Sequence, residues 1–297
     1  MEKVPAAQQF KLHIIVFILG FTAILGKLIH IPAIQLVWYR TFIACCALFI
    51  ILLAGKVKLR LPIVDLAKLA GIGLIVATHW ICFFHAIKVS NVSVTLGILS
   101  TTTLFTSFLE PLISKKKISL IEVFIGLLII AGIYIIFRFE TRYVAGIIFS
   151  LLAAFFASLF SVLNKSIALK YDTNNTAFWE MLAGFAGITI FMFASGEMEV
   201  AKLTLSLSDI LFLLILGVVC TAFAFAATIR LMQKLSAYYI VLAINLEPIY
   251  GILLAWFIFG ESEHMTAGFY TGAAIILLSV FFYPILKRRI TRANNVN

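Results

Sequence analysis

Long apolar stretches separated by short polar connections dominate the pattern of this chain. A membrane-spanning helix needs about 20 mostly apolar residues, and ten stretches meet that requirement. Their expected ranges are 11–30, 33–54, 65–87, 90–113, 118–138, 144–168, 175–195, 209–231, 236–259 and 266–286. The pattern therefore predicts an all-α integral membrane protein with ten transmembrane helices and no separate soluble domain.

Composition supports a lipid environment. Of 297 residues, 63% are hydrophobic and 12% are charged, whereas soluble domains carry roughly 25% charged residues. The net charge of +10 comes from short basic clusters between apolar stretches, so we expect no nucleic-acid partner. The four cysteines lie within apolar stretches and lack metal-ligand spacing. We therefore expect neither a metal nor another cofactor.

The distribution of Lys and Arg predicts the orientation in the membrane. With ten crossings, 17 of the 23 basic residues fall on the side of the termini, five fall on the other side, and Arg40 lies within a helix. The positive-inside rule then places both termini in the cytoplasm. We expect a multi-pass protein of the cytoplasmic membrane, whose oligomeric state, monomer or homodimer, stays open.

An internal repeat predicts the architecture. A shift of 146 residues aligns four pairs of polar or glycine residues: Gly71 with Gly217, Lys88 with Lys234, Ser90 with Ser236 and Gly126 with Gly272. We expect a first repeat over residues 1–139 and a second over residues 140–297, which together form one transport unit. Because each has five helices, an odd number, the second must be inserted upside down. Inverted repeats are typical of secondary transporters.

Several short motifs match a known family. They are Leu19-Gly20, Lys27, Arg40 and Lys88-Val89-Ser90 in the first half, and Leu246-Glu247-Pro248, Phe259-Gly260-Glu261 and Gly272 in the second. Through these motifs, which are spread along its length, the chain resembles the ten-helix EamA branch of the drug/metabolite transporter superfamily. The first half departs from the pattern, with Thr101-Thr102 and Ser114-Lys115 at the equivalent positions. The resemblance implies export of amino acids or related metabolites by alternating access.

Two ionisable residues are candidates for coupling transport to an ion. A charged side chain near the middle of a membrane costs about 2.5 to 3.5 kcal/mol on insertion scales, so it needs a partner, water or a purpose. Glu247 precedes Pro248 near the middle of its expected helix, and a carboxylate beside a distorted helix suits a proton or cation. His79 could line a cavity and titrate near neutral pH. A packing role is the alternative for each.

Polar residues on facing helices predict a central cavity. Helix 90–113 carries Thr101 and Thr102 in a hydroxyl-rich run, which the repeat places opposite the Glu247 region, and helix 144–168 carries a polar stripe. Such hydroxyls also bond back to their own helix. The expected substrate-binding or cavity-lining residues are His79, Trp80, Thr101, Thr102, Ser161, Asn164, Asn245, Glu247 and Tyr250.

Four further ionisable residues are candidates for gating. Arg40 and Glu180 occupy corresponding places in the two halves, toward opposite faces, so we expect no direct pair between them. Lys165, Glu110 and Glu180 have similar depth on the cytoplasmic side, which favours a salt bridge among them. A purely structural role is the alternative.

Other function classes receive less support. An exchanger of anionic metabolites, such as nucleotide sugars or sugar phosphates, would need several converging basic groups, and only Arg40 and Lys165 qualify. We find no protease, hydrolase or phosphate-binding motif, so we expect no enzyme and no use of ATP. An intramembrane enzyme and a passive channel stay as alternatives of another class. The expected partners are a small-molecule substrate and the lipid bilayer.

Overall fold

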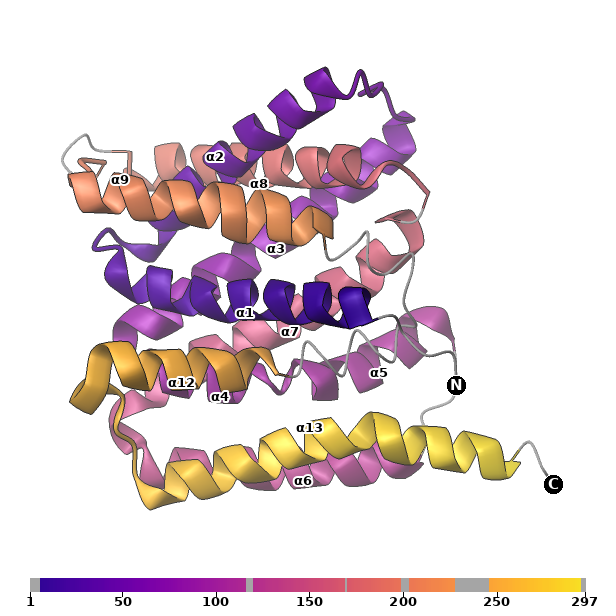
Figure 1. The fold of residues 1–297 in the computed structure, drawn as a ribbon, viewed down its shortest axis with the longest axis vertical. Coiled ribbons are helices and arrows are strands. Elements are labelled where there is room, and N and C mark those ends of the chain that lie inside the picture. The colour runs from indigo at the N-terminus through magenta and orange to yellow at the C-terminus, as the bar shows by residue number, and fades with distance from the viewer. Residues whose placement is uncertain (1–5, 116–119, 169, 199–202, 228–245, 295–297) are drawn as a thin grey trace.

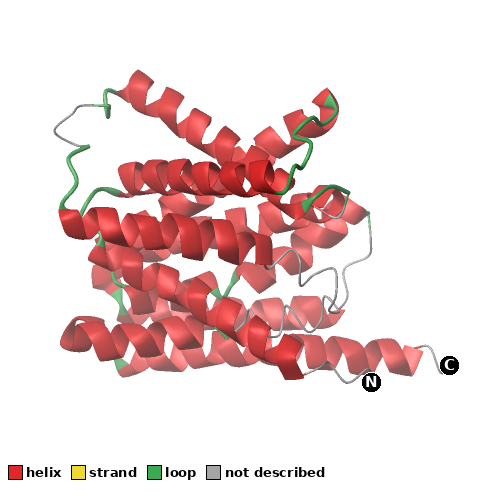
Figure 2. Cartoon of the chain, turned by 45° about the horizontal axis from the view of Figure 1, so that its top comes forward, coloured by secondary structure: helices red, strands yellow, loops and turns green. Residues whose placement is uncertain are grey.

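The computed structural model describes residues 6–115, 120–168, 170–198, 203–227 and 246–294 (Figure 1). Every regular element within these ranges is helical (Figure 2), which confirms the predicted all-α class. In this described part of the chain, seven helices are long and apolar enough to cross a membrane, and shorter apolar helices cover Val123–Phe139 and Ala267–Tyr283. The total of ten helices and the placement of the termini stay predictions.

The elements follow the predicted apolar stretches closely. Those of the first half are α1 (Ala6–Leu28), α2 (Ala33–Ala54), α3 (Ile63–Val89), α4 (Val92–Leu99), α5 (Thr102–Ser114) and α6 (Leu120–Phe139). Those of the second half are η1 (Thr141–Tyr143), α7 (Val144–Ala168), α8 (Thr173–Ser195), α9 (Leu207–Leu214), η3 (Ile215–Phe223), α12 (Glu247–Phe259), η4 (Gly260–Glu263) and α13 (Ala267–Asn294). Helices α2 and α7 cover the ranges 33–54 and 144–168 as predicted.

The predicted continuous helix over 90–113 is wrong at Ser100 and Thr101, which separate α4 from α5. The amide of Thr101 bonds to the carbonyl of Ile98, three residues back, at 3.0 Å. The hydroxyls of Ser100 and Thr102 bond to carbonyls of the preceding turn. Such short-range bonds compete with the regular α-helical ladder, so the span is interrupted without being terminated.

Packing between the two halves is reciprocal. Helix α1 contacts η3 and α12, while α7, its counterpart in the second repeat, contacts α3 and α4. Two further contacts join corresponding helices of the two halves: α2 packs on α8, and α6 lies along α13 (Figure 1). This pattern is what two repeats related by a twofold axis produce. The opposite insertion of the repeats in the membrane stays a prediction.

The outer surface is apolar. Large side chains such as Phe257, Phe193 and Ile190 are at least 69% exposed, while the main core gathers buried residues of α1, α2, α3, α8 and η3. Exposed apolar surface on this scale marks a contact region rather than a water-facing face. Together with the spanning helices it indicates lipid as the surrounding solvent.

Candidate functional site

Arg40 is a buried charged residue that packs against Trp80 of the main core. It is only 3% exposed, and its guanidinium carbon lies 3.9 Å from the centre of the Trp80 ring. Its Nε donates a hydrogen bond of 2.7 Å to Oγ1 of Thr221. Stacking on an aromatic face and one hydrogen bond therefore fix the plane of the guanidinium.

The local fold of η3 explains how Arg40 reaches Thr221. This segment is π-helical, and the Thr221 hydroxyl donates to the carbonyl of Leu216, five residues earlier, at 2.7 Å. Gly217 allows the close approach of α2, because a Cβ there would lie 2.6 Å from Cγ2 of Ile43. Short π-helical stretches occur often at functional sites.

Glu247 is the first residue of α12, and Pro248 follows in the first turn, where a missing N–H is tolerated. The Glu247 side chain is partly buried. Asn245, also predicted for the cavity, lies outside the described residues.

His79 lies beside the Arg40 region on α3. Its Nδ1 donates to the carbonyl of Ala153 on α7 at 2.8 Å, and its ring packs between Phe83 and Phe160. Because a carbonyl only accepts, this bond fixes the proton on Nδ1 and leaves Nε2 as the acceptor nitrogen of the neutral ring. This bond joins α3 to α7, and the expected place of His79 in a cavity stays a prediction.

Hydroxyl-bearing residues of α5 and α7 meet, whereas the expected meeting of the hydroxyl-rich run with the Glu247 region stays a prediction. The Oγ atoms of Thr106 and Ser158 lie 2.8 Å apart. Ser161 instead donates to the carbonyl of Ala157 on its own helix, and Thr102 to Leu99. The Thr101 hydroxyl is fully buried, without a hydrogen-bond partner among the described residues.

The predicted gating residues form two separate pairs. Lys165 Nζ lies 2.9 Å from Oε1 of Glu110, so this part of the predicted salt bridge is present. Glu180 is not part of it: the carboxylate is fully buried and accepts from Nδ2 of Asn164 at 3.2 Å. Arg40 and Glu180 therefore have different partners, as expected.

Tyr250 is half-buried on α12, where it packs against a small apolar cluster of α1. Its hydroxyl is 3.1 Å from Nδ1 of His13, and its ring packs edge-on against Phe17. Both partners belong to α1 and are exposed. Tyr250 thus joins α12 to α1, and its expected place in a cavity stays a prediction.

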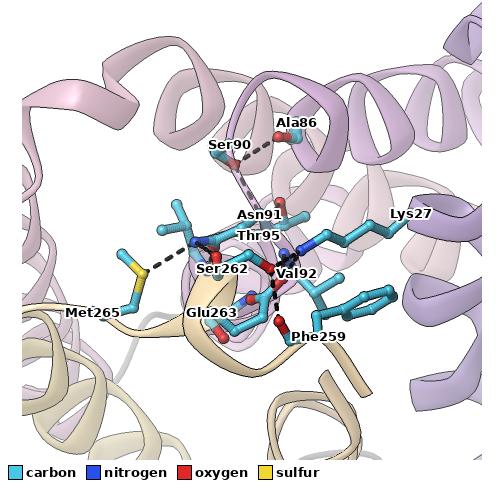
Figure 3. A network of polar contacts seen from close by, with 12 residues as sticks. Lys27, Ala86, Ser90, Asn91, Val92, Thr95, Phe259, Ser262, Glu263 and Met265 are labelled. Atoms are coloured by element: carbon cyan, nitrogen blue, oxygen red, sulfur yellow. Dashed lines mark hydrogen bonds and ion pairs between the residues drawn. The ribbon is translucent and has the colours of Figure 1, made fainter. Parts of the chain in front are cut away.

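A second polar cluster, which sequence reasoning missed, joins the repeats near the first turn of α4 (Figure 3). Glu263 is 1% exposed. Its carboxylate accepts from the backbone amides of Val92 and Ser93 at 3.1 and 2.8 Å and from Nζ of Lys27 at 2.8 Å. An acidic group at a helix N-terminus is stabilised by unpaired amides and the helix dipole.

Asn91 completes this cluster. Its Oδ1 caps α4 by accepting from the amide of Val94 at 2.8 Å, and its Nδ2 lies 3.1 Å from the sulfur of Met265. The sequence did hold a signal for this pair. Glu263 follows the end of an apolar helix, and Lys27 lies near the end of another helix on the same predicted side of the membrane. Within the described residues, no group of three or more His, Cys, Asp or Glu side chains could hold a metal ion.

Comparisons with known proteins agree with this architecture. The family model described as the EamA-like transporter family matches residues 10–138 and 144–284. A solved structure titled only "Crystal structure of protein" is 17% identical, with a TM-score of 0.65 over 96% of this chain and 100% of that chain. At this identity the likeness concerns the fold alone. A search of curated proteins found no match.

Proposed function

Because this chain belongs to the EamA-like transporter family, we propose that it is a secondary transporter of small metabolites that exports amino acids or related compounds. The observation that carries the proposal is the reciprocal packing of two repeats around buried Arg40 and partly buried Glu247. Buried ionisable residues inside a membrane protein mark substrate or ion pathways.

The proposed mechanism is alternating access. The two repeats, residues 1–139 and 140–297, rock about a central site and open it to each side of the bacterial cytoplasmic membrane in turn. His79, Trp80, Thr101, Thr102, Asn164 and Glu247 come from α3, the α4–α5 break, α7 and α12, which are the elements that exchange contacts between the repeats. Glu247 or His79 couples the movement to protons.

An exchanger of sugar phosphates or nucleotide sugars fits less well. Lys165, the second basic residue considered for that reading, is 62% exposed in its side chain and is paired with Glu110. Among the described residues, Arg40 is the only Lys or Arg that is buried. A single buried cation is a poor match for a doubly charged phosphate.

Uptake into proteoliposomes tests the proposal. The purified chain is reconstituted, and movement of a mixture of radiolabelled amino acids is followed with and without a pH gradient. We expect accumulation that the gradient accelerates, with the acceleration lost in Glu247→Gln or His79→Ala. Glu261→Gln and His264→Ala are matched controls, because both side chains are exposed. Proton coupling is wrong if both test variants respond to the gradient like the unmodified protein.

A further inference from the structure

The buried guanidinium of Arg40 has an unused hydrogen-bond donor. Its Nη1 is buried, and no acceptor among the described residues bonds to it. The ring of Trp80 covers one face of the guanidinium, and the hydroxyl oxygen of Thr221 accepts a hydrogen bond from Nε. The unused donor therefore lies in the plane of the group, the direction in which arginine binds carboxylates.

We propose that the Arg40 guanidinium is the binding site for the carboxylate of the transported substrate. This inference rests on the proposed transport function and replaces the gating role expected for Arg40. A desolvated charge with an unpaired donor is costly to keep in a protein interior. Stacking on Trp80 offsets part of that cost, and a bound carboxylate supplies the acceptor that Nη1 lacks among the described residues.

The surroundings favour one chemical class of ligand. Arg40 is the only Lys or Arg classed as buried in the described chain, so the site suits a single negative charge rather than a phosphate dianion. A ligand with one carboxylate, as in an α-amino acid, matches this single positive charge and its free donor.

Thermal unfolding of the purified full chain tests the site, because a ligand that binds only the folded state raises its stability. Three probe mixtures are compared: the common L-amino acids, the amines that correspond to them without the carboxylate, and inorganic phosphate with sugar phosphates. We expect only the first mixture to raise the unfolding temperature. An equal shift with the amines, a shift with the phosphates alone, or no shift with any mixture overturns the proposal.

Variants assign the effect to Arg40. Arg40→Lys keeps the charge but loses the planar set of donors, and Arg40→Gln loses both; each should weaken apparent affinity by roughly tenfold to a hundredfold, as expected for hydrogen bonds between charged groups. Arg138→Gln is the matched control, because Arg138 is exposed at the end of α6. Unchanged affinity in folded Arg40 variants overturns the proposal.

Thr221→Val covers the case in which neither Arg40 variant folds. It retains the guanidinium but removes the acceptor that orients Nε, so binding of the amino-acid mixture should weaken severalfold. Affinity equal to that of the unmodified protein then overturns the proposal.

Transport assays separate the binding role of Arg40 from the proposed transporter function. Arg40 variants that carry amino acids with an unchanged KM refute the binding role alone, whereas Arg40-dependent binding without any transport refutes the transporter function alone.

Discussion

Nζ of Lys27 lies 2.8 Å from Oε1 of Glu263, and this ion pair joins α1 of the first repeat to η4 of the second. The Glu263 side chain is fully buried, whereas that of Lys27 is 25% exposed. Glu263 also accepts the two backbone amides that begin α4. One carboxylate therefore caps a helix and holds the two repeats together.

We predict that Glu263→Ala is strongly destabilising. It leaves Lys27 and two buried amides without their acceptor, and removal of one partner of a buried ion pair typically costs about 3 to 5 kcal/mol. Lys27→Met should cost less, because Lys27 retains contact with solvent and its loss leaves the amides bonded to Glu263. Thermal unfolding in detergent measures both.

The Lys165–Glu110 pair is the control for this comparison. Its distance of 2.9 Å is similar, but the Lys165 side chain is 62% exposed. Exposed pairs contribute about 0 to 1 kcal/mol, so Lys165→Met should barely change the unfolding temperature. Equal losses in Lys165→Met and Glu263→Ala would show that burial does not set the strength of these pairs.

Two glycines on α3 give a sharp test of helix packing. A Cβ at Gly73 would lie 2.2 Å from the backbone carbonyl oxygen of Glu180 on α8, whereas a Cβ at Gly71 would meet no atom within 4 Å. Gly73→Ala must therefore push α8 away, and overpacking of this kind costs about 1 to 3 kcal/mol or more. Gly71→Ala should leave the unfolding temperature and the yield of monodisperse protein unchanged. Similar behaviour of the two variants would contradict the close α3–α8 crossing.

Hydrophobic length predicted most of the fold. Helices α2 and α7 have the bounds expected from the apolar runs, because polar or proline-containing connections delimit those runs. The interruption at Ser100 and Thr101 was not predictable in this way, since hydropathy does not register whether an amide bonds three or four residues back. The ion pair of Lys165 with Glu110 followed from their similar depth.

The site was predicted less completely than the fold. Sequence placed Arg40, Trp80 and Glu247 inside the membrane, but the stacking of Arg40 on Trp80 and its bond to Thr221 depend on how α2, α3 and η3 approach one another. Glu263 was missed because its burial arises only when the repeats meet. Contacts between distant segments carry no periodic signal along the chain, so their partners stay unassigned until the helices are packed.

A polar cluster at the α7–α8 connection predicts the response to alkaline pH. Asp65 accepts from Nζ of Lys170 at 2.8 Å and from the hydroxyl of Tyr171. The hydrogen bond to Asp65 raises the pKa of Lys170 above its ordinary value of 10.5 and that of Tyr171 above 10.0. When the pKa of a group is higher in the folded state, its stabilisation of the fold is complete at pH values below the unfolded-state pKa. That stabilisation is lost as the pH rises through the folded-state pKa.

We therefore expect the unfolding temperature to fall above about pH 10, and to fall less in Asp65→Asn, which already lacks the charged acceptor. Asp172→Asn is the control, because the Asp172 side chain accepts from the backbone amides of Asn174 and Asn175 rather than from Lys170 or Tyr171. Its alkaline profile should follow that of the unmodified protein. The same alkaline profile in Asp65→Asn would refute the assignment.

Glu180 offers a way to separate a structural role from a role in transport. Its buried carboxylate accepts from Nδ2 of Asn164, and its other oxygen, Oε1, is buried without a partner among the described residues. Glu180→Gln retains an acceptor of the same shape for Asn164, so stability should change by less than about 1 kcal/mol. Glu180→Leu removes that acceptor and should cost about 1 to 3 kcal/mol. If Glu180 acts in gating, Glu180→Gln loses transport in proteoliposomes at unchanged unfolding temperature; full transport by this variant would limit Glu180 to packing.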